Sequence, residues 1–243
     1  MKSLLQTETW AKFKEKSGWQ IHKIGGALAL ERVLAAGKSM LYLPEVEYST
    51  DLIKEILKTN APSNRVFTRV EFLERSDPKK TAYLMSKGFK KSFEEIQPEY
   101  RIWLDLTKNI EEISAQMDKK GRYNVGLARR KNLQVVFGGL ELIDRFFNLY
   151  QTTADRKKFA GRDIKYIREL AETLIGNKMG EIVIVYSDQE DLAASLITYY
   201  DGVASFLYSG TGGDRTLKAP YLRHFESYNR DKQKGCTRID LLA

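Results

Sequence analysis

The sequence predicts a mixed α/β protein built in two parts, each with helices packed on the faces of a mixed sheet. Helical patterns alternate with short apolar and β-branched runs along the whole chain, and the second part ends with a strand meander, a helix and a strand. This order favours mixed sheets over a doubly wound parallel sheet. With 243 residues, 42% hydrophobic and 30% charged, the chain is long enough to bury a core and is not a disordered or low-complexity protein.

The first part is predicted to hold strands at residues 20–24, 26–33 and 66–72. An apolar stripe predicts a helix over residues 51–59. Asp77 and Pro78 mark the cap and first residue of a second helix, which Gly88 ends, and residues 89–93 are predicted to be extended. Pro98 cannot lie inside a central strand, so we place a boundary there, with domains of residues 1–97 and 98–243.

The second part alternates helices and strands more regularly. Helices are predicted at residues 110–117, 120–132, 141–156, 163–175 and 217–235. Strands are predicted at residues 101–106, 134–137, 181–186, 192–200, 203–209 and 237–242.

The sequence lacks the residues that disulfides, catalytic triads and metal sites require. The single cysteine, Cys236, excludes an internal disulfide, and His22 and His224 are the two imidazoles. No Gly-x-Ser-x-Gly motif and no recognised metal-ligand spacing occurs. We therefore interpret Cys236 as a buried structural cysteine and His224 as a surface or satisfied histidine, and we expect no metal and no catalytic triad. The chain has no apolar run long enough for a membrane span or signal peptide, which predicts a soluble cytoplasmic protein.

A net charge of +8 favours an anionic partner. The cations concentrate in residues 119–131, where Arg122 and Arg129 share a helix face and Arg130 lies beside them. The stretch itself holds no acidic residue, so it is not a helix laced with its own salt bridges. A solvated face and a docking site for tRNA or nucleotide phosphates are both consistent with this pattern.

Two further segments have two interpretations each. Residues 209–215 form a glycine-rich stretch between a strand and a helix, which is either an acyl-CoA pyrophosphate loop or a flexible turn capped by Asp214. Residues 152–162 join two helices, and Arg162 directly precedes the helix that Asp163 caps. An arginine at a helix start can bind an anion, although the segment can equally be a solvated connector.

These pieces together resemble the Fem family of peptidoglycan aminoacyltransferases, which build bacterial cell-wall cross-bridges. The similar segments occur in the family's order and cover most of the chain: residues 6–14 with Gly18-Trp19, residues 97–98 and 103–107, residues 120–124, residues 153–156 with Phe159 and Arg162, residues 208–210 and residues 219–221.

The resemblance implies two domains of the acyl-CoA N-acyltransferase type. It implies transfer of an amino acid from aminoacyl-tRNA to an amine of a peptidoglycan precursor peptide, without a cofactor, and so a role in cell-wall biogenesis and cell shape. The acceptor would be UDP-muramyl-pentapeptide or its lipid-linked successor, which also implies peripheral contact with the membrane face. Alternatives are a small-molecule N-acyltransferase that uses acyl-CoA and a non-catalytic relative that binds the precursor.

The resemblance also implies roles for residues. Lys14 and Arg162 match positions that bind the precursor's diphosphate, and we expect their side chains to enter one cleft between the two domains. Glu71 matches the carboxylate at the end of the first domain's central strand, while Tyr166 and Tyr208 resemble pocket tyrosines. Arg122, Arg129 and Arg130 would bind tRNA. No catalytic residue is assigned.

The sequence departs from the family pattern at three places. Residues 110–132 are too short for the helical-hairpin arm that some members carry. Residues 43–46 read Leu-Pro-Glu-Val in place of a tight Gly-Pro turn. The sequence ends at Leu242 and Ala243, where relatives continue into a segment with a lysine implicated in catalysis. We therefore expect the second domain to lack that continuation, and the chain to bind precursor but to transfer about 10²–10³ times more slowly.

Overall fold

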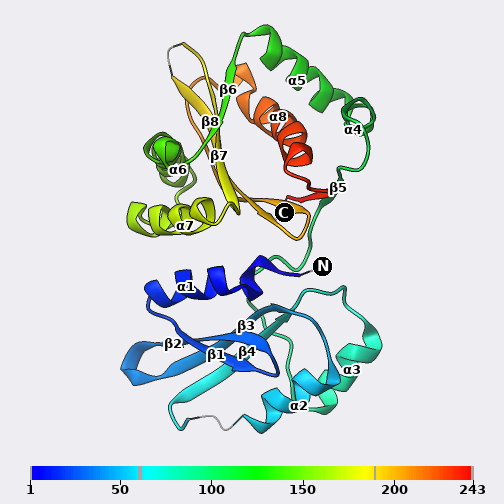
Figure 1. Ribbon diagram of the computed structural model, residues 1–243, viewed down its shortest axis with the longest axis vertical. Coiled ribbons are helices and arrows are strands. Elements are labelled where there is room, and N and C mark those ends of the chain that lie inside the picture. Colours follow the sequence, from blue (N-terminus) through cyan, green and yellow to red (C-terminus); the bar gives the residue numbers. More distant parts are fainter. Residues whose placement is uncertain (1, 60–61, 189, 242–243) are drawn as a thin grey trace. The chain divides into compact units, whose positions relative to one another are not determined.

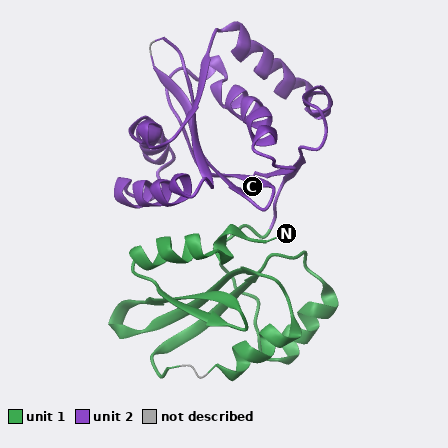
Figure 2. Ribbon diagram, in the orientation of Figure 1, with its two compact units in different colours: residues 1–99 green, residues 100–243 purple. Residues whose placement is uncertain are grey.

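The computed structural model describes residues 2–59, 62–188 and 190–241. The chain forms two compact units, Met1–Glu99 (unit 1) and Tyr100–Ala243 (unit 2), which are coloured separately in Figure 2. Each unit has its own sheet.

Unit 1 is a four-stranded mixed sheet in the order β1-β2-β3-β4 (Figure 1). The strands are β1 (Gln20–Ile24), β2 (Ala27–Val33), β3 (Ser39–Val46) and β4 (Arg65–Phe72). The first three pair antiparallel, and β4 pairs parallel to β3. The helices are α1 (Glu8–Lys16), α2 (Thr50–Lys58) and α3 (Pro78–Ser86), with short 3-10 turns at Leu4–Gln6 and Ala35–Gly37.

Two elements of unit 1 were not predicted. Helix α1 begins after Thr7, whose hydroxyl accepts a hydrogen bond from the Trp10 N–H at 3.1 Å, and it buries Trp10 and Phe13. Strand β3 contains Pro44, a residue that normally argues against a central strand. The pairing of β3 with β4 shifts register between Leu43 and Val46, so Pro44 lies in a bulge where its missing N–H interrupts no ladder bond.

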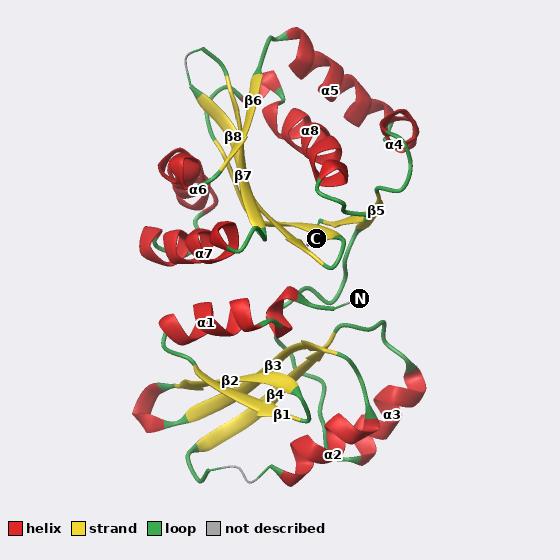
Figure 3. Cartoon of the chain, in the orientation of Figure 1, coloured by secondary structure: helices red, strands yellow, loops and turns green. Residues whose placement is uncertain are grey.

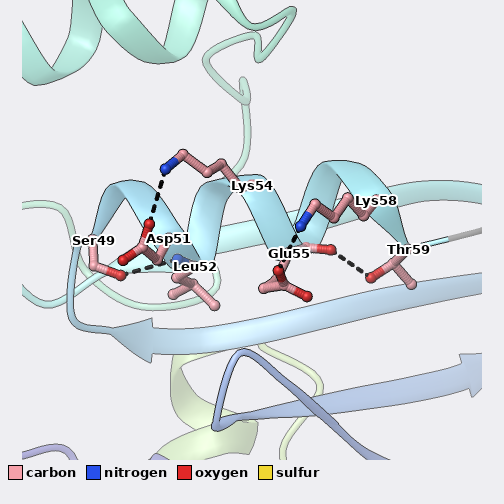
Figure 4. Close-up of polar contacts among 7 residues, drawn as sticks. All are labelled: Ser49, Asp51, Leu52, Lys54, Glu55, Lys58 and Thr59. Carbon is pink, nitrogen blue, oxygen red and sulfur yellow. Dashed lines mark hydrogen bonds and ion pairs between the residues drawn. The ribbon is translucent and has the colours of Figure 1, made fainter.

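Helix α2 shows why its sequence forms a helix (Figure 4). The Ser49 hydroxyl accepts from the Leu52 N–H at 3.0 Å, which caps the first turn. On the exposed face, Lys54 pairs with Asp51 and Lys58 with Glu55, each at 3.0 Å and three residues apart. The opposite face buries Leu52 and Ile53, as the predicted apolar stripe requires.

Unit 2 is a six-stranded mixed sheet in the order β5-β10-β9-β8-β7-β6. The strands are β5 (Trp103–Asp105), β6 (Gln134–Gly138), β7 (Gly180–Tyr186), β8 (Asp191–Tyr200), β9 (Val203–Thr211) and β10 (Arg238–Asp240). β10 runs parallel to β9, and the other pairs are antiparallel. The helices are α4 (Ile110–Gln116), α5 (Lys119–Arg130), α6 (Ile143–Lys157), α7 (Ile164–Gly176) and α8 (Ala219–Gln233).

Helices cover both faces of this sheet (Figures 1 and 3). Helix α6 packs against β8 and β9, and α7 against β7. On the opposite face α8 packs against β7 and β8, and α5 packs on α8. Strands β7 and β8 are therefore buried on both sides, and their central residues are almost all apolar.

The structure differs from the predicted elements in three details. Residues 89–93 form no strand. Helix α8 begins at Ala219, after a 3-10 turn at Arg215–Leu217, because Lys218 has a left-handed backbone. The strand predicted at residues 237–242 is the short β10, and Leu242, at its predicted end, lies outside the described residues, as does Ala243.

Candidate functional site

Arg162, Tyr166 and Tyr208 come together in unit 2, although Tyr208 is far from the other two in sequence. Arg162 ends the connection between α6 and α7, and its guanidinium lies over the Tyr166 ring, 4.9 Å from the centroid. Tyr208 comes from β9, and its phenol interacts with the Arg162 guanidinium. Asp163 caps α7 by accepting from the Tyr166 N–H at 2.7 Å, which places Arg162 at the helix start.

The protonation states suit binding of an anion. Burial alone would lower the pKa of the Arg162 guanidinium, but the Tyr166 and Tyr208 phenols outweigh it and raise that pKa above its ordinary value. Burial raises the pKa of the Tyr208 phenol, and Arg162 offsets only part of the rise. The cluster therefore keeps a cation and a neutral hydroxyl at neutral pH, and both can donate hydrogen bonds to phosphate oxygens.

Tyr150 lies beneath this cluster and was missed in the sequence. Its side chain is 5% exposed on α6, and its hydroxyl accepts a hydrogen bond from the Arg162 backbone N–H at 2.9 Å. Its ring meets the Tyr208 ring edge-on, with centroids 5.7 Å apart. An aromatic residue on the apolar face of a helix has the pattern of an ordinary core residue, so spacing alone gives no signal.

The glycine-rich stretch is not a flexible loop at its start. Gly210 and Thr211 are the last residues of β9, and Gly210 lies directly against the backbone of α6 at Leu149 and Tyr150. The Thr211 N–H and carbonyl bind Thr153 Oγ1 at 2.7 and 3.0 Å. This close approach fixes α6, and hence Tyr150, against the strand that carries Tyr208.

The later residues of the glycine-rich stretch, Gly213 and Asp214, lie against the carboxylate of Glu190. The Asp214 N–H donates to Glu190 Oε1 at 3.2 Å, and the Glu190 carboxylate lies over Gly213. Asp214 also caps the next turn by accepting from the Thr216 N–H at 2.8 Å, as predicted. Glu190 thus engages one backbone donor of this stretch, and the Gly212 N–H donates to the Leu192 carbonyl at 3.0 Å.

Lys14 lies in the last turn of α1 among aromatic rings. Its ammonium is 4.9 Å from the Trp10 ring centroid and 5.7 Å from that of Trp19. Such cation–π contacts orient the side chain.

Glu71 lies on β4, which forms an edge of the described sheet and not its centre, so the predicted central position is wrong. Its carboxylate accepts from the Tyr42 hydroxyl and from the backbone N–H groups of Ile96 and Gln97, at 3.1 and 3.4 Å. Glu71 therefore ties the segment before unit 2 to the sheet of unit 1.

The basic helix α5 holds its three predicted arginines in different settings. Arg122 donates to the carbonyls of Ala115, at 3.0 Å, and Met117, so it caps the end of α4. Arg129 pairs with Glu226 of α8 at 2.8 Å, which is the acidic partner that the stretch itself lacks. Arg130 is exposed. Arg122 and Arg129 line a cavity of about 690 Å³ between α4, α5 and α8.

Cys236 is buried as predicted, whereas His224 is not a surface residue: its Nε2 contacts Arg223 at 2.7 Å and its Nδ1 is buried without a hydrogen-bond partner among the described residues. Cys236 is 6% exposed, and burial raises the pKa of its thiol to about 11. Burial and the neighbouring Arg223 lower the pKa of His224 to about 3. Neither group is poised as a nucleophile or a base at neutral pH. Among the described residues, none of the helices has the length and apolar character to cross a bilayer.

Comparisons with known proteins agree with this architecture. The model of the FemAB family matches residues 83–188. A lipid II:glycine glycyltransferase of Staphylococcus aureus is 24% identical over 220 residues, which cover 79% of this chain and 52% of the relative. The chain thus spans about half the length of the curated relatives it matches.

Two solved structures share the fold. The crystal structure of FemX superposes with a TM-score of 0.83 at 18% identity, over 98% of this chain and 83% of FemX. The C-terminal domain of a putative lysylphosphatidylglycerol synthetase from Agrobacterium fabrum has a TM-score of 0.62 at 9% identity, over 97% and 74% of the two chains.

Two mixed sheets flanked by helices confirm the predicted mixed α/β class, and the structure of FemX shares this fold. The chain is similar to the Fem family in sequence and in fold, as its motifs predicted.

Proposed function

We propose that this chain is an aminoacyltransferase that moves an amino acid from aminoacyl-tRNA to an amine of a peptidoglycan precursor peptide. The FemAB match and the glycyltransferase relative support an acyltransferase that acts on peptidoglycan precursors. The observation that carries the proposal is the cluster of Arg162, Tyr166 and Tyr208, because it gathers a cation and phenols at a helix start.

In this proposal the two units act as two N-acyltransferase-like domains, and the cluster binds the diphosphate of the precursor. UDP-muramyl-pentapeptide and the lipid-linked precursor share that group, so the same donors serve either. We also assign Lys14 of unit 1 to precursor binding, as the family resemblance implies. Three of roughly four acceptor positions on the Glu71 carboxylate are already used, and the remaining one on Oε2 accepts from the substrate.

The reaction needs no covalent intermediate, since an amine attacking the ester of aminoacyl-tRNA releases a good leaving group in a downhill step. The protein contributes by holding the amine against the ester and by stabilising the developing oxyanion. This explains how a chain whose single cysteine is buried and whose His224 is neutral can still catalyse transfer.

Replacing Arg162 with Ala should weaken binding of UDP-muramyl-pentapeptide by about 2 kcal/mol, or roughly thirtyfold, because a charge-assisted contact to phosphate is lost. Titration calorimetry measures this directly, and a second titration with lipid-linked precursor in detergent decides between the two acceptors. Arg168→Ala is the matched control, because Arg168 lies on α7 but pairs with Asp144 at 2.6 Å. Equal affinities for wild type and Arg162→Ala would remove Arg162 from the site.

We assign Arg122, Arg129 and Arg130 to tRNA phosphates. Changing all three to Gln should weaken tRNA binding and reduce the slope of log K against log salt by roughly one unit per lost contact. Precursor affinity should stay the same. Because Arg122 also caps α4, a variant with only Arg129 and Arg130 changed separates charge from structure.

Glu226→Gln is the opposite control for the tRNA assignment. It removes the acidic partner of Arg129 and should strengthen tRNA binding. Filter binding at several salt concentrations tests each variant, and a triple variant with wild-type affinity at low salt would leave α5 as a solvated face.

The acyl-CoA alternative has less support, because Glu190 already engages the loop that a pyrophosphate would need. Thermal stabilisation by UDP-muramyl-pentapeptide but not by acetyl-CoA is the expected result. A non-catalytic precursor-binding relative would show the same stabilisation without turnover, so an aminoacyl-transfer assay with charged tRNA decides between these two.

A further inference from the structure

Tyr150 contacts two separate parts of the Arg162 cluster at once. It lies in the middle of α6, whose last residues lead into the connection that ends at Arg162. The Tyr150 hydroxyl accepts from the Arg162 backbone N–H at 2.9 Å, so it holds the main chain from which the guanidinium projects. Its ring contacts the Tyr208 ring edge-on, at 5.7 Å between centroids.

The surroundings of Tyr150 allow it little freedom. Its ring stacks on Phe146 at 6.1 Å and meets Phe159 edge-on at 6.2 Å. A Cβ at Gly161 would lie 3.3 Å from both the Tyr150 ring and its hydroxyl oxygen, so the connection to α7 packs closely over the phenol. The Gly210 backbone of β9 abuts α6 at the Tyr150 N–H. A buried, close-packed side chain of this kind keeps a single orientation.

The hydroxyl is the part of Tyr150 that packing does not explain. A phenylalanine would fill the same volume, whereas the phenol adds one acceptor, and the partner that it engages is the N–H of Arg162. That N–H lies just before α7, where no intrahelical carbonyl can accept from it. The bond therefore fixes the residue that precedes the helix start and, with it, the direction in which the guanidinium leaves the chain.

We propose that Tyr150 is a positioning residue for the diphosphate of the precursor. It acts through Arg162 and Tyr208, and it holds the guanidinium and the phenol so that they converge on one phosphate group. This inference rests on the proposed function of the same site. It assigns Tyr150 no contact with the substrate, since its side chain is 5% exposed and its hydroxyl is already engaged.

The test is a double-mutant cycle with Tyr150→Phe and Arg162→Ala, read by calorimetric titration of UDP-muramyl-pentapeptide. Tyr150→Phe keeps every ring contact and removes one acceptor, so it should raise Kd roughly five- to tenfold. The double variant should bind no more weakly than Arg162→Ala alone, because Tyr150→Phe keeps the ring contact with Tyr208 and removes only the bond to Arg162, which then has no guanidinium to position. In transfer assays KM should rise and kcat at saturating precursor should stay unchanged.

Tyr186→Phe is the matched control, because Tyr186 is a tyrosine of the same unit at the end of β7. It should leave Kd unchanged. Wild-type affinity in Tyr150→Phe would overturn the inference. A double variant whose Kd rises by the product of the two single effects would overturn it as well, because Tyr150 would then act independently of Arg162. A wild-type chain that binds no precursor would instead overturn the proposed function, and the inference with it.

Discussion

Replacing Asp231 with Asn should remove most of a fall in stability that the wild-type protein shows between pH 4 and pH 8. Asp231 is fully buried on α8, and neither carboxyl oxygen has a hydrogen-bond partner of good geometry among the described residues. Burial raises the pKa of this carboxyl to about 7, and the nearby Tyr199 hydroxyl offsets only part of the rise. The unfolded chain binds a proton at this position only below about pH 4.

The sign of the effect follows from these two pKa values. Between pH 4 and pH 7 the folded protein holds a proton that the unfolded chain has released, so raising the pH favours unfolding. The contribution is fully present below pH 4 and is lost as the pH rises through 7. A difference of this size corresponds to a loss on the order of 3–4 kcal/mol in the free energy of unfolding.

Urea unfolding at several pH values from 4.5 to 8.5 measures this directly. Asp231→Asn should be as stable as wild type near pH 4.5 and more stable by on the order of 3 kcal/mol at pH 8. Glu172→Gln serves as the control, since Glu172 is an exposed acid on α7 and should leave the wild-type pH dependence in place. If the stability of wild type and of Asp231→Asn changed with pH in the same way, Asp231 would already be ionised in the folded protein at pH 4.5, and its pKa would not be raised.

The buried polar stripe that includes Asp231 shows that the spacing of polar residues does not always predict the exposed face of a helix. Arg223, Ser227 and Asp231 are four residues apart on α8 and are all less than 5% exposed. In the sequence such a spacing of polar residues is typical of a solvated face. The helix itself was predicted, but which of its faces meets β7 and β8 depends on contacts with residues far away in the chain.

The fold was predicted best where the local signals agreed. Helices α6 and α7 have long apolar stripes, and the strands of the meander are continuous apolar runs, so both were found. Strand β3 was missed because Pro44 contradicts a strand locally, and only the bulge resolves the conflict. Helix α1 is short, and its signal lies mainly in the Thr7 cap.

The candidate site was predictable only in part for the same reason. Arg162 was singled out by its place at a helix start, whereas Tyr166 and Tyr208 were both assigned by family resemblance. The partners of Arg129 and of the Tyr150 hydroxyl are 97 and 12 residues away in sequence, and no local pattern reports them. The tertiary contacts therefore decide which cations are engaged and which aromatic residue carries a functional hydroxyl.

Replacing Gly210 with Ala should destabilise unit 2 by about 3 kcal/mol, near the upper end for overpacking, because the new methyl group meets backbone and not a movable side chain. An added Cβ would lie 2.6 Å from the Leu149 carbonyl oxygen and would also overlap the Tyr150 N–H. Relief requires α6 to move away from β9. The same movement would separate Tyr150 from Tyr208, so precursor binding should weaken along with stability.

Chemical unfolding of Gly210→Ala and calorimetric titration with UDP-muramyl-pentapeptide test the two effects separately. Gly176→Ala is the matched control, because nothing lies within 4 Å of its added Cβ in the last turn of α7. Alanine is the better helix former, so that variant should be as stable as wild type or more stable by about 0.5–1 kcal/mol, with unchanged binding. Gly210→Ala with wild-type stability would mean that α6 and β9 are not in direct backbone contact. If Gly210→Ala were destabilised but still bound precursor normally, the diphosphate would not depend on the Tyr150–Tyr208 arrangement.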